Sequence, residues 1–170
     1  NSCQSLAVLE ENDIDPRIRP EYILTLDSNN EMLNDAFQRS VDYVYDYAVV
    51  GPTQFPGAGS GVSTTKPFIP SYWGTYSHRS AFVIRDILHQ VEAGILLSLH
   101  EENYTMLNLY AKDALVAQHN YWKKFWPLWS YNFHGEKHPS DSGFQQISAP
   151  LELLEKVYLA YEYTGDERFL

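Results

Sequence analysis

Residues 71–103 read SYWGTYSHRSAFVIRDILHQVEAGILLSLHEEN and contain the clearest helix signal of the chain. Isoleucine, leucine and valine recur there at the spacing of an amphipathic helix, which we expect to run from about Ser80 to Leu99. At roughly 100° per residue, the polar side chains of this helix fall on one face, and the apolar ones lie opposite. The polar face has no lysine and consists of Arg85, Asp86, His89, Gln90 and Glu92.

This polar face has two interpretations. It can be the solvated side of an ordinary amphipathic helix, or it can bind a neutral, hydroxyl-rich ligand such as a sugar. Arg85 offers five fixed donors beside the two acceptor oxygens of Asp86, and vicinal sugar hydroxyls both donate and accept. A tryptophan ring beneath the sugar would complete such a site, although core packing is the favoured role for any single tryptophan. The expected substrate-binding residues are Trp73, Arg79, Arg85, His89, Gln90, Trp126 and Trp129.

Further helices are expected on both sides of this segment. The first begins at Ser28, which forms a capping-box pattern with Glu31, and ends before Gly51. A third runs from about Tyr104 to Tyr121 after a short connection at 100–103. A fourth follows Ser148, its expected N-cap, and ends at Gly165. No strand alternation is evident, so we expect an all-α fold of antiparallel helical hairpins, with long loops at 51–75 and 126–146.

Composition excludes several classes of function. Asp and Glu total 22 against 12 Lys and Arg, giving a formal net charge of −10. This charge disfavours nucleic acid and anionic membrane surfaces as partners. No apolar run approaches the roughly 18–20 residues of a membrane span. The single Cys3 excludes an intrachain disulfide, and no glycine-rich phosphate loop is present, so we expect no cofactor.

Two short motifs were also weighed. His134 and His138 lie four residues apart, but Gly135 and Pro139 argue against the helix that a zinc motif of this spacing needs, so we expect no metal site. Asn103-Tyr104-Thr105 matches the glycosylation sequon, a triplet that often arises by chance.

The two ends of the chain differ in character. Residues 1–27 contain Pro16 and Pro20 and are expected to be irregular. At the other end, Asp166 is the expected N-cap of a helix that starts at Glu167. The sequence stops within the first turn of that helix, so we expect 28–170 to be part of a larger domain.

Three segments resemble a known group of enzymes. Residues 76–90, 126–133 and 151–169 look like the first inner helix, the following loop and the recurrent helix ending of six-hairpin, (α/α)6-toroid glycosidases. The Thr-Gly-Asp ending at 164–166 is common among toroids, whereas the Arg-Asp-x-x-His-Gln pattern at 85–90 is more specific. The resemblance covers roughly 70–170 and implies about four of the twelve helices of a toroid.

The resemblance implies a glycoside hydrolase acting at a non-reducing end, with Arg85 and Asp86 holding the terminal sugar. The alternative makes Asp86 the general acid, and Asp86 is therefore the candidate catalytic residue. A neighbouring guanidinium favours the ionised carboxylate, whereas a general acid must be protonated, so we favour the clamp. The second carboxylate would lie beyond Leu170, with Asp141 as an outside candidate.

Other functions remain open. A sugar epimerase or isomerase on the same toroid would use His89 as its base, and a non-catalytic carbohydrate-binding module would need no base. We expect a carbohydrate partner and a secreted or periplasmic location, and we make no prediction of the oligomeric state.

Overall fold

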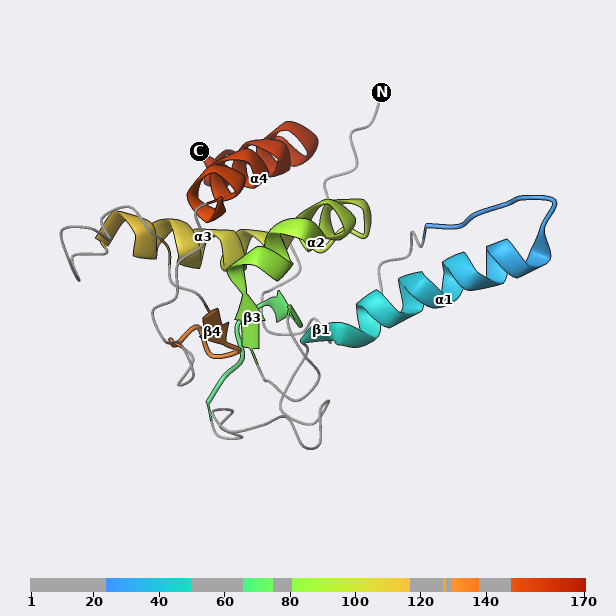
Figure 1. Ribbon diagram of the computed structural model, residues 1–170, viewed down its shortest axis with the longest axis horizontal. Helices are drawn as coiled ribbons and strands as arrows, with labels where there is room; N and C mark the ends of the chain where they lie inside the picture. Colours follow the sequence, from blue (N-terminus) through green and yellow to red (C-terminus); the bar gives the residue numbers. More distant parts are fainter. Residues whose placement is uncertain (1–23, 50–65, 75–80, 117–126, 128–129, 138–147) are drawn as a thin grey trace, which may run out of the picture.

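The computed structural model describes residues 24–49, 66–74, 81–116, 127, 130–137 and 148–170, and this part is mostly helical (Figure 1). The helices are α1 (Glu31–Tyr47), α2 (Ile84–Leu96), α3 (His100–Val116), α4 (Ala149–Thr164) and the short 3-10 helix η2 (Glu167–Phe169). The strands are β1 (Ala48–Val49), β2 (Ser71–Tyr72), β3 (Ala81–Val83) and β4 (Ser130–Asn132).

Helices α2 and α3 form a tight hairpin. Three residues, 97–99, connect them, and Ser98 adopts a left-handed conformation with φ 60°. The amide of Leu99 donates to the carbonyl of Gly94 at 2.8 Å, which closes the turn. Helix α4 packs against both helices of the hairpin (Figure 1). The expected helical hairpin is therefore confirmed for these two helices.

Helix α1 packs against the core through Phe37, Val41, Val44 and Tyr45. Its first turn projects outward, and Met32 is 81% exposed (Figure 1). Nearer the other end, Val41 and Tyr45 are buried. The hydroxyl of Tyr45 donates to the carbonyl of Leu97 at 2.8 Å, which ties α1 to the α2–α3 turn.

Two antiparallel two-stranded ribbons correct the all-α expectation. In one, β1 pairs with β2 and places Ala48 opposite Tyr72. In the other, β3 pairs with β4 and places Phe82 opposite Tyr131. Strands of two or three residues are too short to show alternation in a sequence. The pairing of β3 with β4 and the bridge from Gly74 to Phe82 place described parts of both expected loops beside β3, where α2 begins.

Two helix starts differ from the expected ones. Helix α2 begins at Ile84 rather than Ser80, because 81–83 pair with β4 as a strand. Helix α3 begins at His100, so the expected connection at 100–103 is its first turn. Glu101, exposed in that turn, is favourable there, at the positive end of the helix dipole.

The caps were predicted with mixed success. Ser28 does not cap α1; instead the side-chain oxygen of Asn30 accepts from the amide of Leu33 at 3.3 Å. Ser148 makes no side-chain cap either. Both predictions at the end of α4 are confirmed: Gly165 is left-handed, with φ 67°, and Asp166 accepts from the amide of Arg168 at 3.0 Å.

Aromatic residues from β3, α3 and the segment around β4 pack together in the core. The ring of Phe82 lies 6.0 Å from the rings of both Tyr110 and Tyr131, and 6.4 Å from that of Phe133. The hydroxyl of Tyr110 donates to the carbonyl of Phe82 at 2.9 Å. These aromatic residues thus serve packing.

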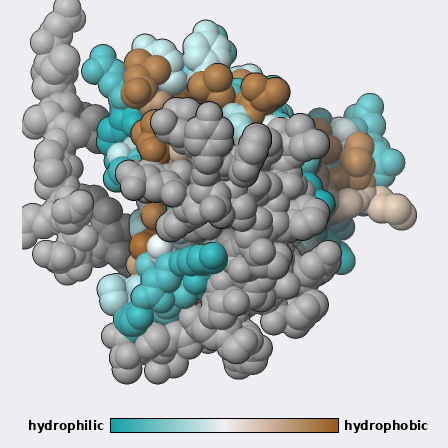
Figure 2. Space-filling model, turned by 60° about the vertical axis from the view of Figure 1, so that its left-hand side comes forward, coloured by the Kyte–Doolittle hydropathy of each residue, from teal (hydrophilic) through white to brown (hydrophobic). Residues whose placement is uncertain are grey.

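The outer face of α4 carries an exposed apolar stripe. Leu151, Leu154 and Tyr158 are 74%, 69% and 56% exposed. Figure 2 shows brown side chains across the top of its view, the height at which α4 lies in Figure 1.

Candidate functional site

The candidate site lies in the first turn of α2. Arg85 and Asp86 are neighbours there, with Nε of the guanidinium 3.5 Å from Oδ1 of the carboxylate. Their side chains are 50% and 33% exposed. A pair that is this open stays accessible to a ligand, and Asp86 also lies where the helix dipole favours negative charge.

Strand β3 and the backbone of Gly74 hold this turn in place. The amide of Val83 donates to the carbonyl of Gly74 at 2.9 Å. A Cβ on Gly74 would lie 2.7 Å from Cγ2 of Ile87 and 3.4 Å from Oε1 of Gln90. Only glycine therefore allows the backbone at residue 74 to pass this close to α2. The side-chain amide of Gln90 lies next to this glycine.

The expected division of α2 into two faces is confirmed. Arg85, His89 and Gln90 are exposed, and Asp86 is half-buried. The opposite face is buried and consists of Ile84, Ile87, Leu88, Val91, Gly94 and Ile95. The first two turns of the exposed face thus present a guanidinium, a carboxylate, an imidazole and an amide together.

Glu92 belongs to a different contact on the same helix. Its carboxylate accepts from Nζ of Lys156 on α4 at 2.5 Å. This hydrogen bond and the charge of the lysine lower the pKa of Glu92. Glu92 therefore fixes α4 to α2.

The aromatic part of the expected site is only partly described. Trp73 is 6% exposed, and its ring centroid lies 5.3 Å from that of Phe133. It is a core residue here and does not offer an open face to a sugar. Arg79, Trp126 and Trp129 lie outside the described residues.

The histidine pair is likewise half described. Nδ1 of His134 lies 2.9 Å from the carbonyl oxygen of Pro67, and its ring packs 4.8 Å from that of Phe68. His138 and Asp141 lie outside the described residues. Among the residues that are described, no group of three His, Cys, Asp or Glu could hold a metal ion.

The sequence analysis missed a buried polar contact behind this site. The hydroxyl of Tyr72 donates to Oδ1 of Asn103 at 2.8 Å, and Nδ2 of Asn103 donates to the carbonyl of Val91 at 3.1 Å. Asn103 is 1% exposed, so the sequon contains a core side chain rather than a glycan acceptor on the folded surface. Burial, with a smaller contribution from Glu102, raises the pKa of Tyr72. Asn103 is a polar residue next to two glutamates, so the sequence pattern did not predict that its side chain would be buried.

No helix among the described residues is long and apolar enough to cross a membrane. No family model matches the chain, and no curated protein or solved structure matches it either.

Proposed function

We propose that the chain is part of a glycoside hydrolase of the (α/α)6 class that acts at the non-reducing end of a carbohydrate. The observation that carries this proposal is the Arg85–Asp86 pair, exposed side by side in the first turn of α2. Lys156 and Glu92, by contrast, join two helices. Arg85 and Asp86 are neighbours on one turn, and their side chains are partly exposed, so a ligand can reach them from solvent.

In this proposal the pair clamps two neighbouring hydroxyls of the terminal sugar. The carboxylate of Asp86 accepts from one hydroxyl, while the guanidinium of Arg85 donates to the oxygen of the next. His89 and Gln90, one turn further on, extend the polar surface along the ring. Hydrolysis then needs a general acid on the leaving oxygen and a carboxylate that activates water, at least one of them from another part of the protein.

Two features of the fold support the toroid. The α2–α3 hairpin has the short connection and close packing of a toroid unit. The apolar stripe on α4, formed by Leu151, Leu154 and Tyr158, suits burial against a neighbouring helix, as in a closed ring of hairpins.

Binding is tested first, because it needs no second carboxylate. The amide resonances of residues 84–90 in the full chain would be followed by NMR while methyl glycosides of several pyranoses are added. At least one glycoside should shift them, and Arg85→Ala should remove the response. If none of a broad panel shifts these amides, the site proposal is refuted.

Turnover is tested with Asp86→Asn on a panel of oligosaccharides. We expect a loss of about 100-fold or more, the scale of a lost transition-state contact, with the melting temperature unchanged. Asp35→Asn, an exposed residue on α1, makes the same change of charge and should leave activity intact. Near-normal hydrolysis by Asp86→Asn would contradict the proposed role, and sugar binding without any hydrolysis would favour a non-catalytic binding module.

One observation favours an epimerase or isomerase as the second candidate. The imidazole of His89 is exposed on the same face as Arg85, one helical turn away, where it could take a proton from a bound sugar. An isomerisation assay on free sugars separates the two activities, since only this candidate converts a monosaccharide without cleaving a bond between sugars.

A further inference from the structure

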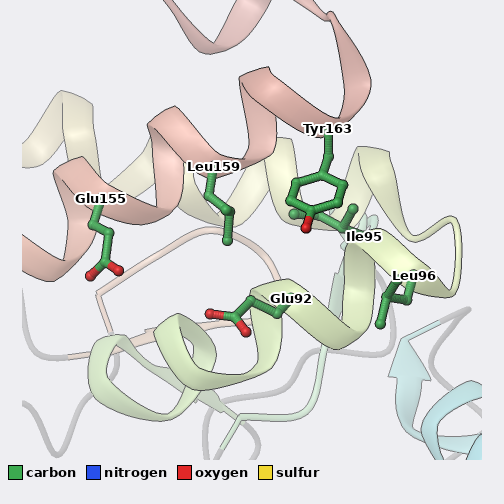
Figure 3. Close-up of a pocket in the computed structure, with 6 residues that line it drawn as sticks. All are labelled: Glu92, Ile95, Leu96, Glu155, Leu159 and Tyr163. Atoms are coloured by element: carbon green, nitrogen blue, oxygen red, sulfur yellow. The ribbon is translucent and has the colours of Figure 1, made fainter.

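A groove of about 210 Å³ lies between the C-terminal half of α2 and the C-terminal part of α4 (Figure 3). Each helix contributes three lining residues. They are Glu92, Ile95 and Leu96 from α2, and Glu155, Leu159 and Tyr163 from α4.

The rim of this groove carries excess negative charge. Lys156, only 12% exposed, places Nζ 2.5 Å from Glu92 but 3.8 Å from Glu155. The lysine thus bonds to one carboxylate and only approaches the other. The Glu155 side chain is 68% exposed and extends toward the groove (Figure 3), so its oxygens remain able to accept from a second cation.

The interior of the groove is apolar and aromatic. Leu159 points from α4 toward α2, and Ile95 and Tyr163 line the same groove (Figure 3). Tyr163 is 67% exposed, so part of its ring is open to a ligand. Apolar walls beneath a carboxylate match a lysine or arginine side chain, whose stem is aliphatic and whose head is charged. An aromatic ring nearby adds attraction for the same cation.

Size and charge select the occupant. A volume of about 210 Å³ falls below the roughly 300–1,000 Å³ of sites for whole small molecules, so one side chain fits better. The net charge of −10 attracts a basic segment over longer distances and repels a second copy of this chain. We propose that the α2–α4 groove docks a lysine or arginine side chain of a basic peptide segment from a partner protein.

This site is separate from the sugar clamp. Asp86 precedes Glu92 by six residues, a rise of about 9 Å along α2. The two proposals can therefore fail independently. A variant that removes the sugar clamp should leave peptide binding at the groove unchanged, and a variant in the groove should leave sugar binding unchanged.

The test uses an acetylated, amidated heptapeptide with a central lysine among alanines, and a twin with norleucine in place of the lysine. Each is titrated into the full chain while the amide resonances of residues 92–96 and 155–163 are followed by NMR. We expect the lysine peptide to shift these amides with a millimolar Kd that weakens as salt is added, and the norleucine peptide to bind at least about threefold more weakly, the scale of an exposed ion pair.

Glu155→Gln should weaken binding of the lysine peptide by about two- to fivefold. Glu167→Gln makes the same change of charge on an exposed residue outside the groove and should have no effect. Three results would overturn the proposal: equal binding of the two peptides, equal effects of the two variants, or no shift at these amides. Concentration-dependent shifts without peptide would assign the groove to a second copy and would overturn it as well.

Discussion

The contact between Asn103 and Gly94 allows a sharp test of how α2 and α3 are joined. Gly94 packs directly against the amide of Asn103: a Cβ added at Gly94 would lie 2.7 Å from Oδ1 and 2.8 Å from Nδ2. Both groups are buried, and the amide is held on its other sides by Tyr72 and Val91. We therefore expect Gly94→Ala to destabilise the chain, and Asn103→Ala to relieve much of that effect.

The magnitudes follow from the contacts. Asn103→Ala leaves the buried hydroxyl of Tyr72 without an acceptor, at about 1–3 kcal/mol, and removes a second bond of about 0.5–1.5 kcal/mol. Together these give about 1.5–4.5 kcal/mol. Gly94→Ala forces a methyl group into a filled space, which typically costs about 1–3 kcal/mol. In the double variant the amide that meets the methyl group is gone, so the combined loss should fall short of the sum by at least about 1 kcal/mol.

The assay is urea unfolding of the two single variants, the double variant and the parent chain, followed by tryptophan fluorescence. Tyr72→Phe serves as a further control, since it removes the hydroxyl and should lessen the effect of Asn103→Ala. Stability losses that simply add would refute the contact, as would a Gly94→Ala chain as stable as the parent. For a chain of this size each kcal/mol corresponds to about 2–4 °C in melting temperature, so the effects are well within reach.

Two further variants test other parts of the fold. Burial, with Glu101 contributing, raises the pKa of Glu102, so the folded chain binds its proton more tightly than the unfolded chain and the free energy of unfolding falls as the pH rises above about 4.3. Glu102→Gln should therefore raise the melting temperature more at pH 7 than at pH 4, and identical pH profiles of the variant and the parent chain would count against the partly buried carboxylate. Phe169 is 7% exposed and packs edge-on against Tyr104, with centroids 5.6 Å apart, so Phe169→Ala should cost about 2–4 kcal/mol in the same unfolding assay. Leu170→Ala, next to it but 80% exposed, should stay within about 0.5 kcal/mol, and equal losses for the two would disprove the docking of η2.

Helix periodicity was the most dependable guide in the sequence. The apolar spacing in α2 predicted its buried face almost residue by residue, because that face depends only on local geometry. The ending of α4 was predictable for a similar reason. Gly165 takes a left-handed conformation and Asp166 caps the next turn, and both roles follow from the residue type alone.

Features that depend on distant partners were not predictable. Residues 81–83 were assigned to a helix because their pairing with 130–132 is invisible from the local pattern. Ser28 was a reasonable cap, yet its hydroxyl bonds to Asn34 at 2.7 Å instead, and Asn30 takes the capping role. Trp73 was offered as a sugar platform, but its neighbour Phe133 comes from sixty residues away in the chain and covers it.

The contacts that hold α2 in place decide how a change at the sugar clamp, Arg85 and Asp86, should be interpreted. Asn103 fixes α2 at Val91, and Lys156 fixes it at Glu92, both beyond the turn that carries Asp86. Asp86 itself is one-third exposed and makes its ion pair only with its neighbour Arg85 among the pairs found in the described residues. Removing its charge therefore leaves the supports of the helix in place, so lost activity at constant stability would report on the ligand. The same loss in Gly94→Ala would report on the position of α2, and comparing the two variants separates chemistry from architecture.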